Sequence, residues 1–162
     1  MCIHSFLITN GNGELLLSHY EVPLNVQDKA AWETELRTQT KDLWSMAGVQ
    51  CTSQVAKAAG KAQEEVIIVF RHDARAGLIF FLSGTEEHDE LTLDEALGCL
   101  IWVITSLCCE GKGTLCESRL LLGEVYGKVC IAVDEVIGGG VLESLDPQHV
   151  LSMSKLRAPI PT

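Results

Sequence analysis

The five histidines of this sequence are the first residues to consider for acid–base or nucleophilic chemistry. No serine, cysteine or aspartate lies near them at a spacing that is diagnostic of a catalytic dyad or triad. A catalytic site would therefore have to be assembled from segments that are distant along the chain. We interpret the histidines instead as surface residues or as satisfied residues of strands. They are His4, His19, His72, His88 and His149.

Two acidic pairs have the residue type that acid–base catalysis uses: Asp94 with Glu95, and Asp134 with Glu135. The first pair falls in the first turn of a predicted helix, where the helix dipole stabilises negative charge. We interpret the second pair as facing solvent or a partner. Residues 111–114 (GKGT) resemble part of a phosphate-binding loop, but they follow a predicted helix and lack the first glycine of that motif. The sequence thus predicts no catalytic residue, no cofactor and no bound nucleotide.

The cysteines predict neither a disulfide framework nor a metal site. Their number is odd, no CxxC pair occurs, and several lie in apolar runs, which is typical of reduced and buried thiols. A strand-like run begins at Cys2, so we expect no signal peptide and a cytoplasmic protein. The apolar run at 97–109 is shorter than the roughly 20 residues that span a bilayer, and it predicts a buried helix. The seven cysteines are Cys2, Cys51, Cys99, Cys108, Cys109, Cys116 and Cys130.

The net charge is −10, from 12 basic and 22 acidic residues. Nucleic-acid phosphates and anionic lipids attract Lys and Arg, and the sequence has no basic run. We therefore expect no binding to nucleic acid, and contact with a membrane only through a partner. With 162 residues, of which 47% are hydrophobic, the chain fits one globular domain.

The N-terminal third predicts a β-hairpin and a helix. Residues 2–9 and 14–20 are rich in strand formers and are separated by an Asn-Gly turn. Asn25 is a predicted N-cap, and a helix follows it. The helix has one apolar face, which we expect to cover the sheet. This face carries Trp32, Leu36 and Leu43.

The middle of the chain predicts three more strands. Residues 49–55 predict a short strand, followed by a loop to about 63. Residues 66–71 and 77–83 are almost continuous apolar runs, and the short linker between them predicts a hairpin. Strands that are apolar on both faces are covered on both sides, either by helices of the same chain or by a partner.

The last third predicts helices at 92–109 and 115–137 and a short helix from Asp146–Pro147. Residues after Arg157 contain two prolines and predict a frayed tail. The predicted order is ββα-βββ-ααα, an α+β fold.

Four segments resemble, in the right order, the small (sigma and zeta) subunits of clathrin-adaptor and coatomer complexes. They are residues 3–20 (IHSFLITNGNGELLLSHY), 75–83 (RAGLIFFLS), 93–104 (LDEALGCLIWVI) and 133–144 (VDEVIGGGVLES). The branch of this family that the resemblance suggests is the small subunit of the plant TPLATE (TSET) endocytic complex. The resemblance implies a longin, or SNARE-like (profilin-like), fold: a five-stranded antiparallel sheet flanked by helices. It implies one longin-type domain over residues 1–157, with a frayed tail at 158–162.

The resemblance also implies sites. The pocket that binds acidic dileucine cargo signals in several adaptors would fall on Ala76, Leu78 and Ile101. The family has a basic residue just after the first turn, where this chain has Glu14 and Leu15, and a carboxylate there would repel an acidic signal. An interface with a larger subunit would use apolar strand residues and the second acidic pair. These interface residues are Val66, Ile68, Phe80, Asp134 and Glu135.

The function that the resemblance implies is that of a non-catalytic small subunit of a cytosolic vesicle coat. Its partners would be a large adaptin-like helical-solenoid subunit and a medium subunit, and the complex would be recruited peripherally to membranes or coated pits. Two alternatives stay open. One is a longin subunit of a tethering complex or of a scaffold for small-GTPase regulators. The other is a small enzyme whose site is formed by residues distant in sequence, which a pocket with perturbed titratable groups would support.

Overall fold

The computed structural model describes residues 3–21, 24–43, 50–57, 65–85, 90–109, 113–138 and 146–156. The predicted tail at 158–162 and most of the predicted loop before residue 63 lie outside these residues. The described elements combine one antiparallel sheet with helices, which confirms the α+β class.

The sheet has five strands in the order β2-β1-β5-β4-β3, and each neighbouring pair is antiparallel. The first strand lies between β2 and β5, so two hairpins that are distant in sequence are joined through β1. The two edges are β2 and β3. The strands are β1 (Ile3–Asn10), β2 (Leu15–Tyr20), β3 (Gln50–Lys57), β4 (Glu65–Asp73) and β5 (Leu78–Thr85).

The helices depart from the prediction in the last third of the chain. The predicted helix at 115–137 is two helices, because Leu122 has an extended backbone (φ −62°, ψ 129°). The helix predicted at 92–109 begins earlier than expected, since α2 starts at Glu90 rather than at Thr92. The helices are α1 (Val26–Thr40), the 3₁₀ turn η1 (Lys41–Leu43), α2 (Glu90–Cys109), α3 (Glu117–Leu120), α4 (Gly123–Ile137) and α5 (Pro147–Leu156).

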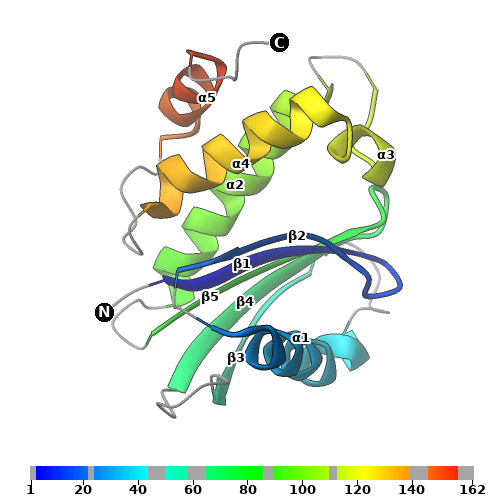
Figure 1. The fold of residues 1–162 in the computed structure, drawn as a ribbon, viewed down its shortest axis with the longest axis vertical. Coiled ribbons are helices and arrows are strands. Elements are labelled where there is room, and N and C mark those ends of the chain that lie inside the picture. Colours follow the sequence, from blue (N-terminus) through cyan, green and yellow to red (C-terminus); the bar gives the residue numbers. More distant parts are fainter. Residues whose placement is uncertain are drawn as a thin grey trace.

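Figure 1 shows the elements in layers, with α1 on one face of the sheet and α2 and α4 on the other. Helix α2 crosses β4 and β5, α4 packs on α2, and α5 contacts both α4 and α2. Helix α5 is the farthest of them from the sheet (Figure 1). The sheet is therefore covered on both faces by helices of the same chain.

Local side-chain chemistry fixes the two turns at one end of the sheet. In the first turn, Asn10 Oδ1 accepts the backbone N–H groups of Asn12 and Glu14, both at 3.0 Å, and Gly13 has a φ of 83°. A left-handed φ of this kind is strained for residues with a Cβ atom. In the β4–β5 turn, the carboxylate of Asp73 accepts the N–H groups of Arg75 and Ala76 at 3.1 Å. Such Asx turns stabilise a chain reversal without help from distant residues.

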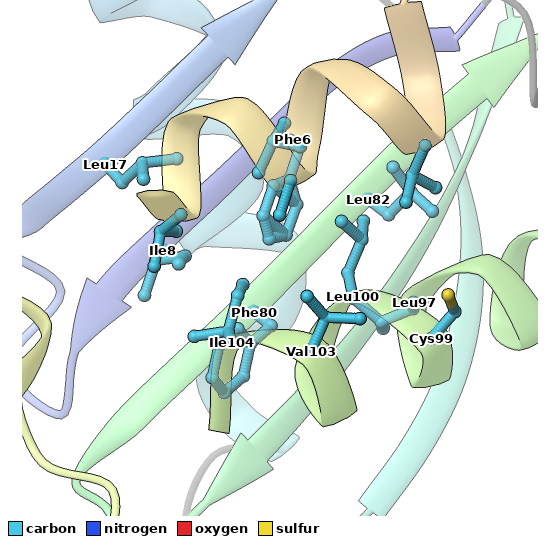
Figure 2. Close-up of a cluster of buried hydrophobic side chains, with 14 of the residues drawn as sticks. Phe6, Ile8, Leu17, Phe80, Leu82, Leu97, Cys99, Leu100, Val103 and Ile104 are labelled. Atoms are coloured by element: carbon cyan, nitrogen blue, oxygen red, sulfur yellow. The ribbon is translucent and has the colours of Figure 1, made fainter. Parts of the chain in front are cut away.

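The larger core lies between the sheet and α2. Figure 2 shows Phe6, Ile8, Phe80 and Leu82 of the sheet facing Leu97, Leu100, Val103 and Ile104 of α2, with Leu17 of β2 beside them. All of these side chains are buried. Helix α4 extends this core with Val129, Ala132, Val133, Val136 and Ile137.

The smaller core lies between the sheet and α1, and it contains a polar link. Trp32 is fully buried, and its indole N–H donates to Ser5 Oγ at 3.0 Å. Ser5 Oγ is in turn 2.7 Å from Ser83 Oγ, which joins α1 to β1 and β5. Asn25 caps α1 as predicted, since its Oδ1 accepts the N–H of Asp28 at 2.8 Å. The remaining side chains of this core are Leu7, Leu36, Val66, Ile68, Phe70, Ile79 and Phe81.

Helix α2 is long and apolar enough over Leu91–Cys109 to cross a membrane, judged by length and composition alone. Its inward side packs in the larger core through Leu93, Leu97, Leu100 and Leu107, as core helices of soluble proteins do.

Candidate interaction surfaces

The apolar strand residues predicted as a partner interface are buried inside the chain itself. Val66 and Ile68 lie in the core under α1, Phe80 lies in the core under α2, and each is 0% exposed. The apolar character of β4 and β5 is therefore explained by cover from both sides within this chain. The structure leaves no surface of these three side chains for a larger subunit to contact, which corrects this part of the predicted interface.

The second acidic pair lies on α4. Asp134 is exposed and Glu135 is half-buried, so both positions can be reached from outside this chain.

The first acidic pair has a role that the sequence did not reveal. Asp94 Oδ1 accepts a hydrogen bond at 2.8 Å from the guanidinium of Arg71 on β4, and the two side chains are 33% and 25% exposed.

Arg71 reaches this partner across Gly98 of α2. A Cβ atom at position 98 would lie 3.4 Å from Arg71 Nη2, so the guanidinium occupies the space that a larger side chain would need. The ion pair and the close approach together link β4 to the exposed side of α2.

A hollow of about 430 Å³ lies between the β4–β5 turn and the last turns of α2. Ala76 lines it, together with Asp73 and Arg75 from the turn and Thr105 from α2. Leu78 is fully buried, and Ile101 is half-buried against the larger core. Of the three residues predicted for a cargo pocket, the structure therefore places Ala76 in the hollow and does not place Leu78 or Ile101 in its lining.

Glu14 does not face this hollow. It lines a different cavity, next to α1, on the opposite face of the sheet from α2. The charged residues at the Ala76 hollow are Asp73, whose carboxylate is engaged by the turn, and the exposed Arg75. The repulsion predicted from Glu14 therefore acts at another site.

Large apolar side chains are exposed on α2 and between α3 and α4. Leu91 and Trp102 are 11 residues apart on α2, which places them about 20° apart around the helix axis. This surface could not be predicted from the sequence, because Trp102 lies in a run that is apolar all round. The exposed fractions are 69% for Leu91, 41% for Trp102, 46% for Leu121 and 57% for Leu122.

The described histidines are not brought together into one group. His4 is buried beside Trp32, with ring centroids 4.6 Å apart, and burial lowers the pKa of His4 to about 4. His19 contacts the carboxylate of Glu21. His72 is on β4 and His149 is on α5, while His88 lies outside the described residues.

Two thiols of α2, Cys99 and Cys108, are held in the neutral form. Burial raises the pKa of Cys99 to about 11 and that of Cys108 to about 12. A thiol is nucleophilic or metal-binding only as the thiolate, so neither residue is activated for chemistry. Within the ranges that the structure describes, no three His, Cys, Asp or Glu residues form a group that could hold a metal ion.

Comparisons with known proteins agree with the resemblance seen in the sequence. The chain is 29% identical to TSET complex member tstD of Dictyostelium discoideum over 155 residues, covering 96% of this chain and 93% of that protein. It is 26% identical to coatomer subunit zeta-1 of Homo sapiens over 157 residues, covering 96% of this chain and 77% of that protein. The chain is a homologue of tstD and of coatomer zeta. The similarity to small adaptor and coatomer subunits predicted from the sequence is thereby confirmed.

One structural neighbour has a similar fold. A chain of the full-length AP-3 complex, a homology model in a stretched open conformation, superposes with a TM-score of 0.61 at 14% identity. The match covers 95% of this chain and 92% of that one. No protein-family model matches the chain.

Proposed function

We propose that this chain is a non-catalytic small subunit of a vesicle coat or adaptor complex, in which it stabilises a larger subunit. The observation that carries the proposal is similarity along 96% of the chain to subunits of two different coat complexes, TSET and coatomer. The site geometry supports it. The described histidines are dispersed, the thiols of Cys99 and Cys108 are held neutral, and large apolar side chains on α2 and before α4 are exposed.

The finer assignment is a longin-type domain over residues 1–157. The interior position of β1 between β2 and β5, the single helix on one face of the sheet and the helical layer on the other support this assignment. The partners would be a large adaptin-like solenoid subunit and a medium subunit of the same coat. The complex would act in endocytosis or another vesicle-mediated transport step, with clathrin as the proposed outer coat. The subunit would work in the cytoplasm and meet membranes or coated pits only through the complex, because a net charge of −10 opposes direct binding to anionic lipid.

The proposed contact with the large subunit is the exposed apolar surface of α2. Trp and Leu side chains that are half-exposed in an isolated subunit are typical of an interface that a partner covers. Asp134 and Glu135 on α4 remain proposed polar contacts of such an interface, since both can be reached from outside.

The Ala76 hollow is the proposed place for a cargo signal. Arg75 at its rim supplies a positive charge that an acidic signal needs, whereas the hydroxyl groups of Thr105 and Ser106 already donate to carbonyls of their own helix. Leu78 and Ile101 would contribute only if α2 moved, because neither lines the hollow in this conformation.

Affinity purification of the tagged chain from its native cytosol, with mass spectrometry of the co-eluting proteins, tests the proposal. A stoichiometric set with a large solenoid chain and a medium chain is the expected result. Recovery of tethering-complex subunits would support the alternative longin function, and recovery of the chain alone would contradict every complex-based function.

A matched pair of variants locates the interface. Trp102→Ala removes an exposed aromatic side chain from α2, and we expect it to reduce the recovery of the large chain. Val26→Ala removes an apolar side chain that is 83% exposed on α1, on the other face of the sheet, and should leave recovery unchanged. Equal loss in both variants would place the contact elsewhere.

A further inference from the structure

A second cavity, distinct from the Ala76 hollow, opens between α1 and the start of β2. Its volume is about 100 Å³, which is room for one side chain. Its walls include Leu7, Leu36 and Phe81, all of which are buried in the smaller core. Its rim includes Leu15, which is 41% exposed on the edge strand β2, so the cavity can be reached from the side of the sheet.

Thr9 lines this cavity and carries an unsatisfied hydroxyl group. The residue is 5% exposed, and its Oγ1 atom has no hydrogen-bond partner among the residues that the structure describes. Two other buried hydroxyls are satisfied within their own helices, since Thr40 donates to the Leu36 carbonyl at 2.7 Å and Ser154 to the Val150 carbonyl at 2.8 Å. A buried hydroxyl without a partner is destabilising, so a ligand that reaches Thr9 gains a hydrogen bond that the free chain lacks.

The charges at this cavity are mainly negative. Glu14, Glu33 and Arg37 line it, which gives two carboxylates against one guanidinium. Glu33 also accepts a hydrogen bond at 3.1 Å from the hydroxyl of Tyr20. The exposed carboxylate of Glu14 therefore favours a ligand that brings positive charge to the rim.

We propose that this cavity binds one tyrosine side chain of a partner protein, from a segment with a lysine or arginine next to that tyrosine. The ring would pack against Leu7, Leu36 and Phe81, and the phenol O–H would pair with Thr9 Oγ1. A phenylalanine would fill the same space but leave Thr9 unsatisfied, whereas a tryptophan has a larger ring and can only donate. The proposal rests on the proposed function in one respect, namely that the chain works bound to other proteins.

Short peptides test the proposal on the full chain, because they need no knowledge of the partner. The probes are acetyl-Lys-Tyr-Lys-amide, the same peptide with phenylalanine, and acetyl-Glu-Tyr-Glu-amide, each titrated while backbone amide chemical shifts are followed by NMR. We expect shifts at Thr9, Gly13, Leu15 and Leu36, with the tyrosine peptide binding roughly five- to tenfold more tightly than the phenylalanine peptide. The acidic peptide should bind more weakly than the basic one.

Two variants distinguish the contribution of the Thr9 hydroxyl to peptide binding from that of the Glu14 charge. Thr9→Val keeps the shape of the side chain, so it should remove the preference for tyrosine and also raise the melting temperature of the free chain. Glu14→Arg should weaken binding of the basic peptide. Glu124→Arg, the same change at an exposed position of α4, should leave that binding unchanged.

Equal binding of the tyrosine and phenylalanine peptides, preference for the acidic peptide, or shifts confined to other elements would each overturn the inference. These outcomes are independent of the purification experiment, which can succeed while the peptides fail to bind.

Discussion

The face of the sheet under α1 and the face under α2 and α4 bury side chains of different kinds. Under α2 the core is almost entirely apolar and is closed by several helices (Figure 2). Under α1 one helix covers the sheet, and the core contains a buried histidine, two serines and a tryptophan joined by hydrogen bonds and ring contacts.

The difference separates two ways of fixing a helix on a sheet. Apolar packing is non-directional, so the α2 face is stabilised by area and by close packing. The hydrogen bond from Trp32 to Ser5 is directional and ties α1 to one position on β1. A small cavity with an unsatisfied Thr9 remains beside this link, so the α1 face is the less completely packed of the two.

The largest expected effect compares two neighbouring phenylalanines of β5 that point to opposite faces. Phe80→Ala should lower the free energy of unfolding by about 3–5 kcal/mol, because its ring is fully buried in the larger core. Phe81→Ala should cost less, because α1 alone covers that side and can move toward the space left. Urea denaturation of both variants measures the difference, and equal costs would mean that the α1 face is packed as rigidly as the α2 face.

A pH-dependent effect is expected from the α1 face, through His4. Burial lowers the pKa of His4 from 6.5 to about 4, so the unfolded chain binds a proton at a pH where the folded chain does not. The neutral histidine is compatible with folding above pH 6.5, and stability falls as the pH drops from 6.5 toward 4. Between pH 7.5 and pH 5 we expect a loss of about 2 kcal/mol.

The matched variant for this effect is His4→Phe, which keeps a ring beside Trp32 but cannot be protonated. The difference in unfolding free energy between the original chain and this variant, measured across that pH range, isolates His4 from the carboxylates. A difference that stays constant with pH would contradict a low pKa for His4.

The directional link under α1 should have a smaller effect. Trp32→Phe removes the indole N–H that Ser5 Oγ accepts, while Ser5 keeps its contact with Ser83. We expect a loss of about 1–2 kcal/mol in unfolding free energy and faster hydrogen exchange in α1 than in α2. Trp102→Phe, on the exposed side of α2, is the control and should change stability by less than about 0.5 kcal/mol.

The features that the sequence predicted are local ones. The Asn10–Gly13 turn, the Asn25 cap and the short β4–β5 connection depend on residues within a few positions of one another, and the structure confirms each. The break at Leu122 was missed although a local signal exists, since the next residue is Gly123 and glycine disfavours a helix interior.

The missed site features depend on pairs that are far apart in sequence. Periodicity showed that β4 and β5 are apolar on both faces, but it could not show that α1 and α2 of the same chain provide the cover. The cavity at Thr9 needs β1, β2, β5 and α1 in place, so no single segment predicts it. Asp94 was predicted in the first turn of a helix, but α2 begins four residues earlier, at Glu90. Its pairing with Arg71 also requires knowing which strand lies beneath α2.

That pairing gives the smallest expected effect, and it tests whether the α2 face also uses a directional link. Arg71 and Asp94 are a quarter to a third exposed, so solvent screens their attraction, and we expect a coupling energy of about 0.5–1 kcal/mol. A double-mutant cycle with Arg71→Met and Asp94→Asn measures this energy and excludes the cost of each change alone. The coupling should shrink in 1 M salt, since screening acts on exposed charges. A coupling as large as the cost of Trp32→Phe would show that both faces are fixed by polar contacts, and the contrast between them would then lie only in how completely each core is packed.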